Sequence, residues 1–186
     1  MANLNEFRNR LTGGGARANQ FKVDITSPFI SDTNALSFLC RSASLPAMTI
    51  GEVPVFYRGR QIYVAGDRTF ADWTVTVYND GGWVARSNME NWNNALQEIG
   101  NSTVGAQDPS AYYGTIDVTQ LDRSDNPLRT AQLVDAWPTN VGEIALAYDT
   151  VDAVEEFDVT FRFNYMQLGV GSTLGSGGSV RVTATF

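Results

Sequence analysis

Alternating apolar and polar residues mark most of this chain as β-strand. Residues 20–26, 69–78, 115–121 and 155–168 each place apolar side chains on one face and polar side chains on the other. The longest run alternates apolar Phe157, Val159, Phe161, Phe163 and Tyr165 with polar Asp158, Thr160, Arg162 and Asn164. This period of two predicts strands that bury one face only.

One segment, residues 82–99, has the spacing of a helix instead. Its apolar residues fall near one helical face at Val84, Met89, Trp92, Leu96 and Ile99. Gly100 follows as a stop signal. A single helix among strands is expected to pack against one side of a barrel or sandwich.

A glycine turn predicts an exposed hairpin over residues 47–68. Val53–Tyr57 and Arg60–Ala65 are strand-like runs on either side of Arg58-Gly59. Glycine suits the positive φ that a tight hairpin turn requires.

The two ends of the chain differ from its middle. Residues 1–19 end in Gly13-Gly14-Gly15 and are predicted to be a flexible arm with little structure of its own. Residues 20–186 are predicted to form a single domain. Within it, a Gly/Ser-rich stretch at 169–179 precedes an alternating run, Ser179–Phe186, which we expect to be a strand in need of a partner.

The order of these elements predicts the fold class. Strands, one helix and further strands with hairpin connections indicate a mostly β protein, an antiparallel β-barrel or sandwich with one flanking α-helix at about residues 82–99.

The composition leaves little chemistry for an enzyme. The chain has no histidine, one cysteine (Cys40) and one lysine (Lys22). Histidine-dependent triads and metal sites are therefore excluded, as is an internal disulfide. No catalytic residue, cofactor or metal is expected, and Cys40 is interpreted as a small buried apolar residue.

Three features keep a second class of function open. Carboxylates gather at 155–158, Asp122–Asn126 partly resembles a calcium loop without its spacing, and four tryptophans could stack on sugars. Solvated acids and core packing explain most of these residues. A carbohydrate-binding or hydrolase β-sandwich remains the distant alternative.

The charge balance argues against binding nucleic acid through its phosphates. With 13 basic and 20 acidic residues, the formal charge is −7. No apolar run is long enough for a transmembrane helix, and the N-terminus has no signal-peptide core, so we expect no membrane partner and synthesis in a cytoplasm. Arg58, Arg60 and Arg68 lie in the predicted hairpin, either as solvated charges or as contacts between subunits.

A series of short motifs, in order, resembles the tail tube protein of contractile-tailed bacteriophages. The match runs from about residue 16 to residue 168 and rests on these segments: Asn19–Phe21, Leu45–Ala47, Ile50–Val53, Tyr57–Arg60, Val64–Arg68, Trp73–Val77, Pro138 through Ile144, and Glu155–Phe161. Each motif is short and carries no chemistry, but together and in order they are specific.

The resemblance implies a structural protein of the virion. Six copies would form a ring, and the rings would stack into a hollow tube inside a contractile sheath, through which DNA is ejected. The implied partners are further copies of the chain, the tail sheath protein, a baseplate or tube initiator, the tape measure protein, and DNA that passes without sequence-specific binding. An inner tube of a phage-derived contractile injection particle that delivers protein is the close alternative.

Two sets of residues follow as candidates for this function. A ring of six copies would carry a formal charge of −42, six times −7, and negative charge in the bore would keep DNA from adhering. The candidate lumen-facing residues are Asp72, Thr74, Thr76, Asp158, Thr160 and Asn164. The candidate inter-subunit residues are Arg58, Arg60 and Arg68.

Overall fold

Nine strands and one long helix dominate the part of the chain that the computed structural model describes, which is residues 4–10, 15–30, 37, 39–101, 105–106 and 108–170. The strands are β1 (Phe21–Thr26), β2 (Cys40–Ala43), β3 (Met48–Tyr57), β4 (Arg60–Phe70), β5 (Trp73–Tyr78), β6 (Gly114–Leu121), β7 (Pro127–Val141), β8 (Glu156–Arg162) and β9 (Tyr165–Val170). The helices are α1 (Leu4–Arg10), α3 (Val84–Leu96) and a short 3-10 turn, η2 (Pro109–Ala111).

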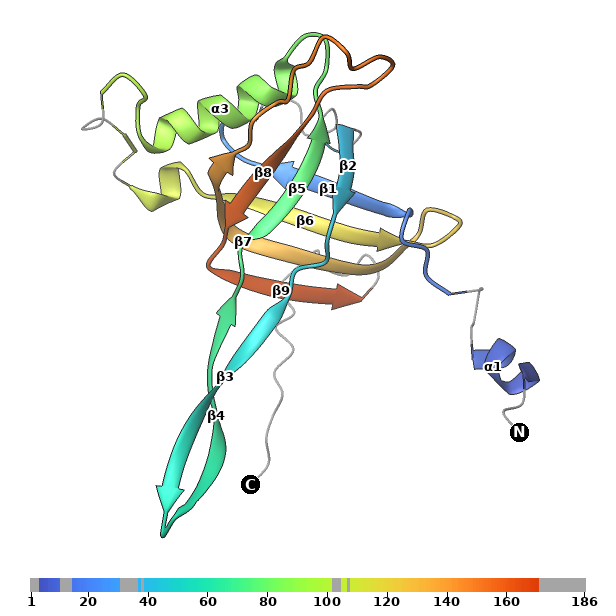
Figure 1. Ribbon diagram of the computed structural model, residues 1–186, viewed down its shortest axis with the longest axis vertical. Coiled ribbons are helices and arrows are strands. Elements are labelled where there is room, and N and C mark those ends of the chain that lie inside the picture. The colour runs from blue at the N-terminus through green and yellow to red at the C-terminus, as the bar shows by residue number, and fades with distance from the viewer. Residues whose placement is uncertain are drawn as a thin grey trace.

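Seven strands form the body, and every pairing in it is antiparallel. Their order is β1–β6–β7–β8–β5–β2, with β9 also paired to β7. Residues 129–134 of β7 pair with β9, and residues 137–141 pair with β8. We call β1–β6–β7–β9 the first sheet and β7–β8–β5–β2 the second sheet; Figure 1 shows their strands crossing in two layers.

β7 joins the two layers because it bends in its middle. Its register with β6 shifts between the pairs Ile116–Leu133 and Gly114–Ala136. Asp135, inside that shift, has a φ of 56°, a left-handed conformation that Asp tolerates better than most residues. Such a bulge turns a strand and lets one strand serve both sheets.

The core lies between the two sheets and confirms the alternation read from the sequence. Both sheets and α3 contribute its fully buried residues: Val23, Ile25, Trp73, Val75, Val77, Ala85, Met89, Trp92, Ile116, Val118, Leu133, Ala136, Phe157, Val159, Phe161 and Phe163. The predicted mostly β, antiparallel fold with one flanking helix is therefore confirmed.

α3 covers one side of this sandwich, as its spacing predicts (Figure 1). Trp92 is completely buried, with its ring 5.8 Å from that of Phe161 and its Nε1 donating to the Tyr112 carbonyl at 2.8 Å. The predicted helical face was wrong at both ends, because Val84 and Ile99 are exposed. The helix is shorter than predicted, and only its central turns reach the core.

Two predicted strands are each divided in the structure. The run 69–78 breaks between β4 and β5, and the run 155–168 breaks between β8 and β9. Beyond the second break Tyr165 is 44% exposed rather than in the core. Alternation continues through the second bend as Phe163, Asn164 and Tyr165, whereas the adjacent Phe70 and Ala71 interrupt it at the first.

The N-terminal arm contains a short helix, α1, where little structure was predicted. Figure 1 shows α1 lying away from the two sheets. The predicted strand 179–186, most of the Gly/Ser-rich stretch and most of the triple-glycine hinge lie outside the described residues.

Candidate functional site

The predicted hairpin is the most prominent surface feature of the molecule. Among the described strands β3 and β4 pair only with each other, and they project far from the body (Figure 1). Arg58 and Gly59 form the turn with φ values of 47° and 81°, the two positive values that a type I′ turn needs. The hairpin lies around this turn, with strands longer than the sequence suggested.

Both faces of this hairpin carry exposed apolar side chains. Every residue of β3 is exposed. The large apolar residues that the hairpin exposes are Met48, Ile50, Val53, Val55, Phe56, Tyr57, Ile62, Tyr63 and Val64. An isolated two-stranded ribbon is marginal in water, and a large exposed apolar patch marks an interaction surface. The hairpin thus has the composition of an element that is completed by another molecule.

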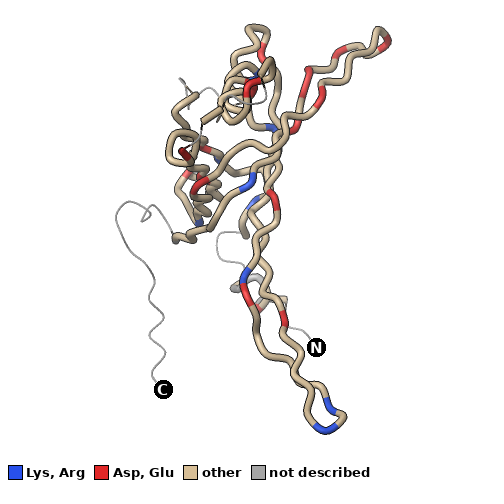
Figure 2. Tube along the Cα trace, turned by 90° about the vertical axis from the view of Figure 1, so that its left-hand side faces the viewer, with Lys and Arg blue, Asp and Glu red and all other residues tan. Residues whose placement is uncertain are grey.

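The three candidate arginines are separated along the hairpin. Arg58 and Arg60 lie at its tip, and Arg68 lies nearer the body, paired in register with Ile50 (Figure 2). The Arg58 guanidinium lies 5.3 Å from the centre of the Tyr57 ring, and Arg68 contacts the Met48 sulfur at 3.2 Å. Within the described part of the chain none of the three has an acidic partner.

Five of the six candidate lumen residues lie together. Four are on the outward face of β5 and β8, and the fifth, Asp72, directly precedes β5. The hydroxyls of Thr74 and Thr160 are 3.1 Å apart across the strands, and Thr76 donates to Asp158 at 2.7 Å. Asp72, just before β5, accepts a hydrogen bond of 2.6 Å from an arginine of β8. The structure thus brings these five to one polar face, where they make three separate contacts.

Asn164, the sixth candidate, lies apart from that face. It occupies the bend between β8 and β9, where its side chain donates to the Tyr113 hydroxyl at 3.3 Å and to Asp135 at 3.4 Å. Apolar and polar residues keep alternating through this bend, and for that reason the sequence pattern placed Asn164 on the same face as Asp158 and Thr160.

The charges of this face are largely neutralised by residues that the sequence did not single out. Arg162 pairs with Asp72, and Arg41 of β2 pairs with Glu156. These pairs join strands far apart in the sequence, so only the register of the sheet reveals them. Asp158 is the acid that no basic side chain of the described residues offsets.

The first sheet has a second polar face that the candidates did not include. Lys22 and Asp24 pair at 3.0 Å, and Asp24 lies opposite Asp117 in register. Burial, with Asp24 adding to it, raises the pKa of Asp117 above the ordinary value. Farther along, the hydroxyls of Thr119 and Thr130 meet at 3.1 Å, as the threonines of the other face do.

The edges of the two sheets differ in how they are covered. Within the described residues β1 pairs only with β6, and β9 pairs only with β7, so the first sheet ends in an open strand on each side. In the second sheet β2 also pairs only with β5 within these residues, whereas residues 137–142 at the other end contact α3, where Asn93 donates to the Pro138 carbonyl at 3.2 Å and Arg86 to the Gly142 carbonyl at 2.5 Å. Open edges are templates for pairing with another chain.

An acidic loop, residues 142–155, was also missed as a functional surface. It carries four acids and no basic residue, mixed with exposed Leu146, Tyr148, Val151 and Val154. The exclusively negative sign of its charges over fourteen residues was a usable signal in the sequence.

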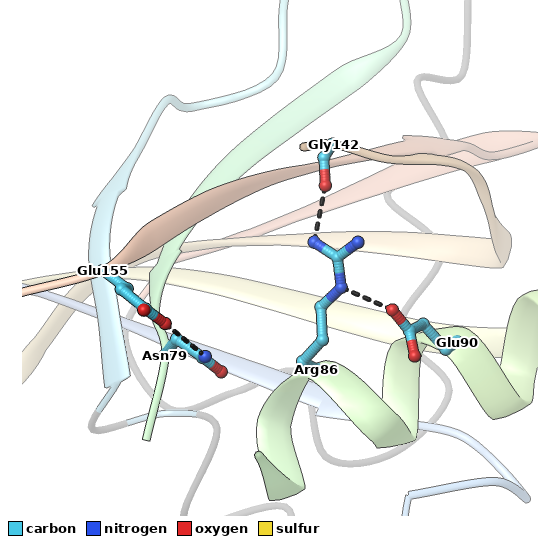
Figure 3. Close-up of polar contacts among 5 residues, drawn as sticks. All are labelled: Asn79, Arg86, Glu90, Gly142 and Glu155. Atoms are coloured by element: carbon cyan, nitrogen blue, oxygen red, sulfur yellow. Dashed lines mark hydrogen bonds and ion pairs between the residues drawn. The ribbon is translucent and has the colours of Figure 1, made fainter. Parts of the chain in front are cut away.

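Both ends of the acidic loop are fixed (Figure 3). Arg86 of α3 holds Gly142 while bonding Glu90 at 2.6 Å, and Asn79 donates to the Glu155 carboxylate at 3.0 Å. The middle of the loop projects from the body at the end opposite the hairpin (Figures 1 and 2).

The other chemical candidates have structural explanations. Asp122 accepts from the backbone N–H groups of Ser124 and Asn126 at 2.7 and 2.8 Å, which makes it a turn former. Trp73 and Trp92 are core residues. Burial raises the pKa of the Cys40 thiol to about 11, which makes it a poor nucleophile at neutral pH.

The described residues contain no group of three or more acids and cysteines arranged to hold a metal ion. None of the helices in the described part of the chain has both the length and the apolar character to cross a bilayer.

Comparison with known proteins points to one family. The family described as phage tail tube protein matches residues 7–167. The tail tube protein gp19 of Enterobacteria phage T4 is 35% identical over 157 residues, covering 84% of this chain and 93% of that protein. The tail tube protein of Serratia phage KSP90 is 28% identical over 172 residues, covering 88% and 95%.

Solved structures share the fold at much lower identity. A chain of the PVC sheath–tube complex, from an extracellular contractile injection system in its extended state, has a TM-score of 0.65 at 12% identity, covering 88% of this chain and 97% of that one. A chain of the anti-feeding prophage baseplate has a TM-score of 0.62 at 14% identity, covering 83% and 95%.

Proposed function

We propose that this chain, which belongs to the phage tail tube protein family, assembles as stacked hexameric rings into the hollow inner tube of a contractile phage tail, through which DNA is ejected into the host. The exposed hairpin, apolar on both faces, is the observation that carries the self-assembly. Membership of a family of structural proteins confirms that the chain is not an enzyme and leaves the hydrolase and carbohydrate-binding alternative without support.

The open edges of the first sheet support a closed ring. β1 on one side and β9 on the other can pair with the opposite edges of neighbouring copies. Head-to-tail pairing of identical subunits gives a ring when the rotation closes. The wall of the tube would then be one continuous sheet without free edges.

The same edges favour the first sheet as the wall that faces the lumen. Its outward face carries Lys22, Asp24 and Asp117 among threonines, a polar surface with a net negative charge. Five of the six residues predicted from the sequence would place the second sheet there instead, and they stay the alternative. Either face lacks the cationic character that would hold DNA phosphates.

Two matched threonines separate these assignments. Thr119 and Thr160 each face outward in a cross-strand threonine pair of 3.1 Å, one in each sheet. In assembled tubes of T119C and T160C chains, we expect a bulky maleimide to spare residue 119 and to label residue 160. The reverse result would assign the lumen to the second sheet. Native Cys40 reacts slowly because of its raised pKa and gives a low background.

Further partners are proposed from the tube assignment itself. The outer surface would contact a tail sheath protein. Support comes from a chain of similar fold that is part of a sheath–tube complex. A baseplate or tube initiator would nucleate the first ring, and a tape measure protein would occupy the lumen before DNA. The site of action is the virion, after synthesis in the host cytoplasm.

The inner tube of a protein-delivering injection particle is the second candidate. The fold shared with injection-system chains supports it, whereas the 35% identity to a phage tail tube protein favours the virion. Capsid and DNA-packaging genes beside this gene would decide for the virion.

Electron microscopy tests the tube directly. Purified chain, imaged in negative stain over a concentration series, is expected to form hollow rings and then tubes. Monomers alone at every concentration, including in the presence of assembled baseplates, would contradict the proposal.

A further inference from the structure

β9 is an edge strand without the usual protection (Figure 1). Within the described residues it pairs only with β7, and its other edge is open. None of its six residues is charged or a proline, and Tyr165 and Leu168 are 44% and 39% exposed. Natural sheets protect such edges with charges, prolines, bulges or a covering segment. A short uncharged strand with an open edge otherwise pairs readily with strands of other chains.

The other open edges of the two sheets have protection of their own. β1 carries two charged residues, Lys22 and Asp24. β2 is only four residues long, carries Arg41, and has a register shift between Cys40 and Ser42. Charges, short length and irregular pairing all discourage the addition of a further strand. Among these edges of the described strands, β9 is therefore the one that most needs a cover from elsewhere.

The sequence that follows β9 has the composition of such a cover. Residues 171–178 are rich in glycine and serine, as a flexible connection requires. Residues 179–186, which we call the tail run, lie outside the described residues. They alternate apolar Val180, Val182, Ala184 and Phe186 with polar Arg181, Thr183 and Thr185. This is the period of a strand that buries one face.

The core side of β9 is incompletely covered. Met166 lies opposite the fully buried Leu133 and packs against the core. Leu168 lies opposite the buried Ala131 on the same side of the sheet, but it is exposed. A further strand on the open edge would set its own side chains beside Leu168, because residues that pair across strands are in contact.

One antiparallel register fits the tail run to this edge. With Val180 opposite Val170, residues 171–179 form the connection. Val182 then lies opposite Leu168, and all six residues of β9 are paired. The apolar residues of both strands share the core side in this register, whereas a shift by one residue would turn the apolar face of the tail run outward.

We propose that the tail run pairs with the open edge of β9 in the unassembled subunit and must leave it before a ring can close. The inference rests on the proposed tube and deepens it, because ring closure uses the same edge for β1 of a neighbouring copy. The family match ends at residue 167, so the tail run lies beyond it. The covered edge keeps free subunits apart until a growing assembly offers its own strand.

The cover acts by lowering the fraction of subunits that can associate. If the edge of β9 is free in about one subunit in ten, ring formation needs about ten times more protein. Removing the tail run, or weakening its pairing with β9, should therefore lower the concentration at which rings form.

Paired cysteines test the docking in the monomer. Gln167 and Thr183 are opposite each other on the outward side in this register, so the Q167C/T183C chain should form an internal disulfide on oxidation with copper–phenanthroline. In the Q167C/A184C control the two thiols lie on opposite sides of the sheet, and oxidation should be at least tenfold slower. The oxidised Q167C/T183C chain should stay monomeric at concentrations where its reduced form makes rings. Native Cys40 contributes little, because its thiol has a pKa of about 11.

A deletion and two matched point variants test the effect on assembly. The chain without residues 171–186 keeps every core residue and should form rings at a concentration at least fivefold below that of the wild type. V182D sets a charge on the core side beside Leu168 and should act in the same direction. L174D places the same charge in the connection and should change the concentration less than twofold. Size-exclusion chromatography over a concentration series, with negative-stain imaging of the ring fraction, measures these values.

The outcomes keep the two proposals apart. A Q167C/T183C chain that oxidises no faster than its control would overturn the docking and leave the tube function intact. A deletion that leaves the concentration for rings unchanged, or raises it, would do the same, as would equal effects of V182D and L174D. If neither the full chain nor the deleted chain ever forms rings or tubes, the tube function is overturned, and with it the role of the docking in assembly.

Discussion

Asp80 shows how a single side chain determines where the helix begins. Its carboxylate accepts from the backbone N–H of Ala85 at 3.0 Å, of Val84 at 3.2 Å and of Gly82 at 3.2 Å. These bonds, that to Ala85 foremost, hold the pKa of Asp80 below its ordinary value. Helix N-termini have backbone donors without helical partners, and Asp80 satisfies them from outside the helix.

We therefore expect Asp80→Ala to lower the free energy of unfolding by about 1 kcal/mol at pH 7. A lowered folded-state pKa contributes stability above the unfolded value and loses it as pH falls through the folded value. The difference between wild type and variant should thus shrink below about pH 4. Urea unfolding of monomeric subunits from pH 7 to pH 3 measures it.

Asp80→Asn is the control, because it keeps an acceptor and removes the titration. It should lose less than the alanine variant at pH 7. A wild-type advantage over Asp80→Ala that stayed constant down to pH 3 would contradict this account.

Residue-scale reasoning from the sequence identified which side chains are buried but not which ones pair. Val75, Val159 and Ile116 follow from alternation alone, because the period of a strand is local. Arg162 with Asp72 depends on the register of two strands ninety residues apart, which no local pattern specifies. Asn164 lies apart from the other candidates for a different reason, the bend after β8, which the alternation does not mark.

At the scale of elements, the contact between α3 and the first sheet depends on a glycine. A Cβ on Gly114 would lie 2.6 Å from the Thr26 carbonyl oxygen and 2.7 Å from the Trp92 ring. Both neighbours are held, one by the β1–β6 pairing and the other by its bond to Tyr112. The helix can approach the sheet this closely only because residue 114 has no side chain.

Gly114→Ala should accordingly lower the free energy of unfolding by about 1–3 kcal/mol, the usual cost of overpacking. Gly81→Ala is the matched control, since a Cβ there meets nothing within 4 Å. Urea unfolding followed by tryptophan fluorescence compares the two. Equal effects would show that the close approach is not what makes Gly114 important.

Element boundaries could be predicted from the sequence where a turn residue marks them. Arg58-Gly59 located the hairpin and Gly100 the end of the helix to within a few residues. The bend at residues 163–164 lacks such a signal, because side chains keep alternating through it, whereas Phe70-Ala71 interrupts the alternation at the bend before β5. The open edges and the anchored loop needed the three-dimensional order of the strands.

On the scale of the whole molecule, the body and the hairpin are separable. Glu52 and Ala65 are directly paired, so Asn-Gly can join them in place of residues 53–64. Phe70, which packs its ring 5.4 Å from Phe163, stays in place. All of β3 is exposed, so the shortened chain removes no core contact.

The shortened chain is expected to unfold with a free energy within about 1 kcal/mol of the wild type, because loss of exposed residues seldom costs more. It should form no tubes at ten times the concentration that suffices for the full chain. Urea unfolding and negative-stain imaging measure the two properties. Tubes from the shortened chain would show that the hairpin is dispensable for assembly.

The unlike ends of the subunit, one basic and one acidic, give the assembly a direction. Each copy that joins the tube covers the exposed end and presents an identical exposed end in its place. The next copy therefore meets the same surface after every step. Such a structure contains no information about when to stop. The final length must be counted by some other molecule, and a defect in that counter would give overlong particles made of perfectly normal subunits.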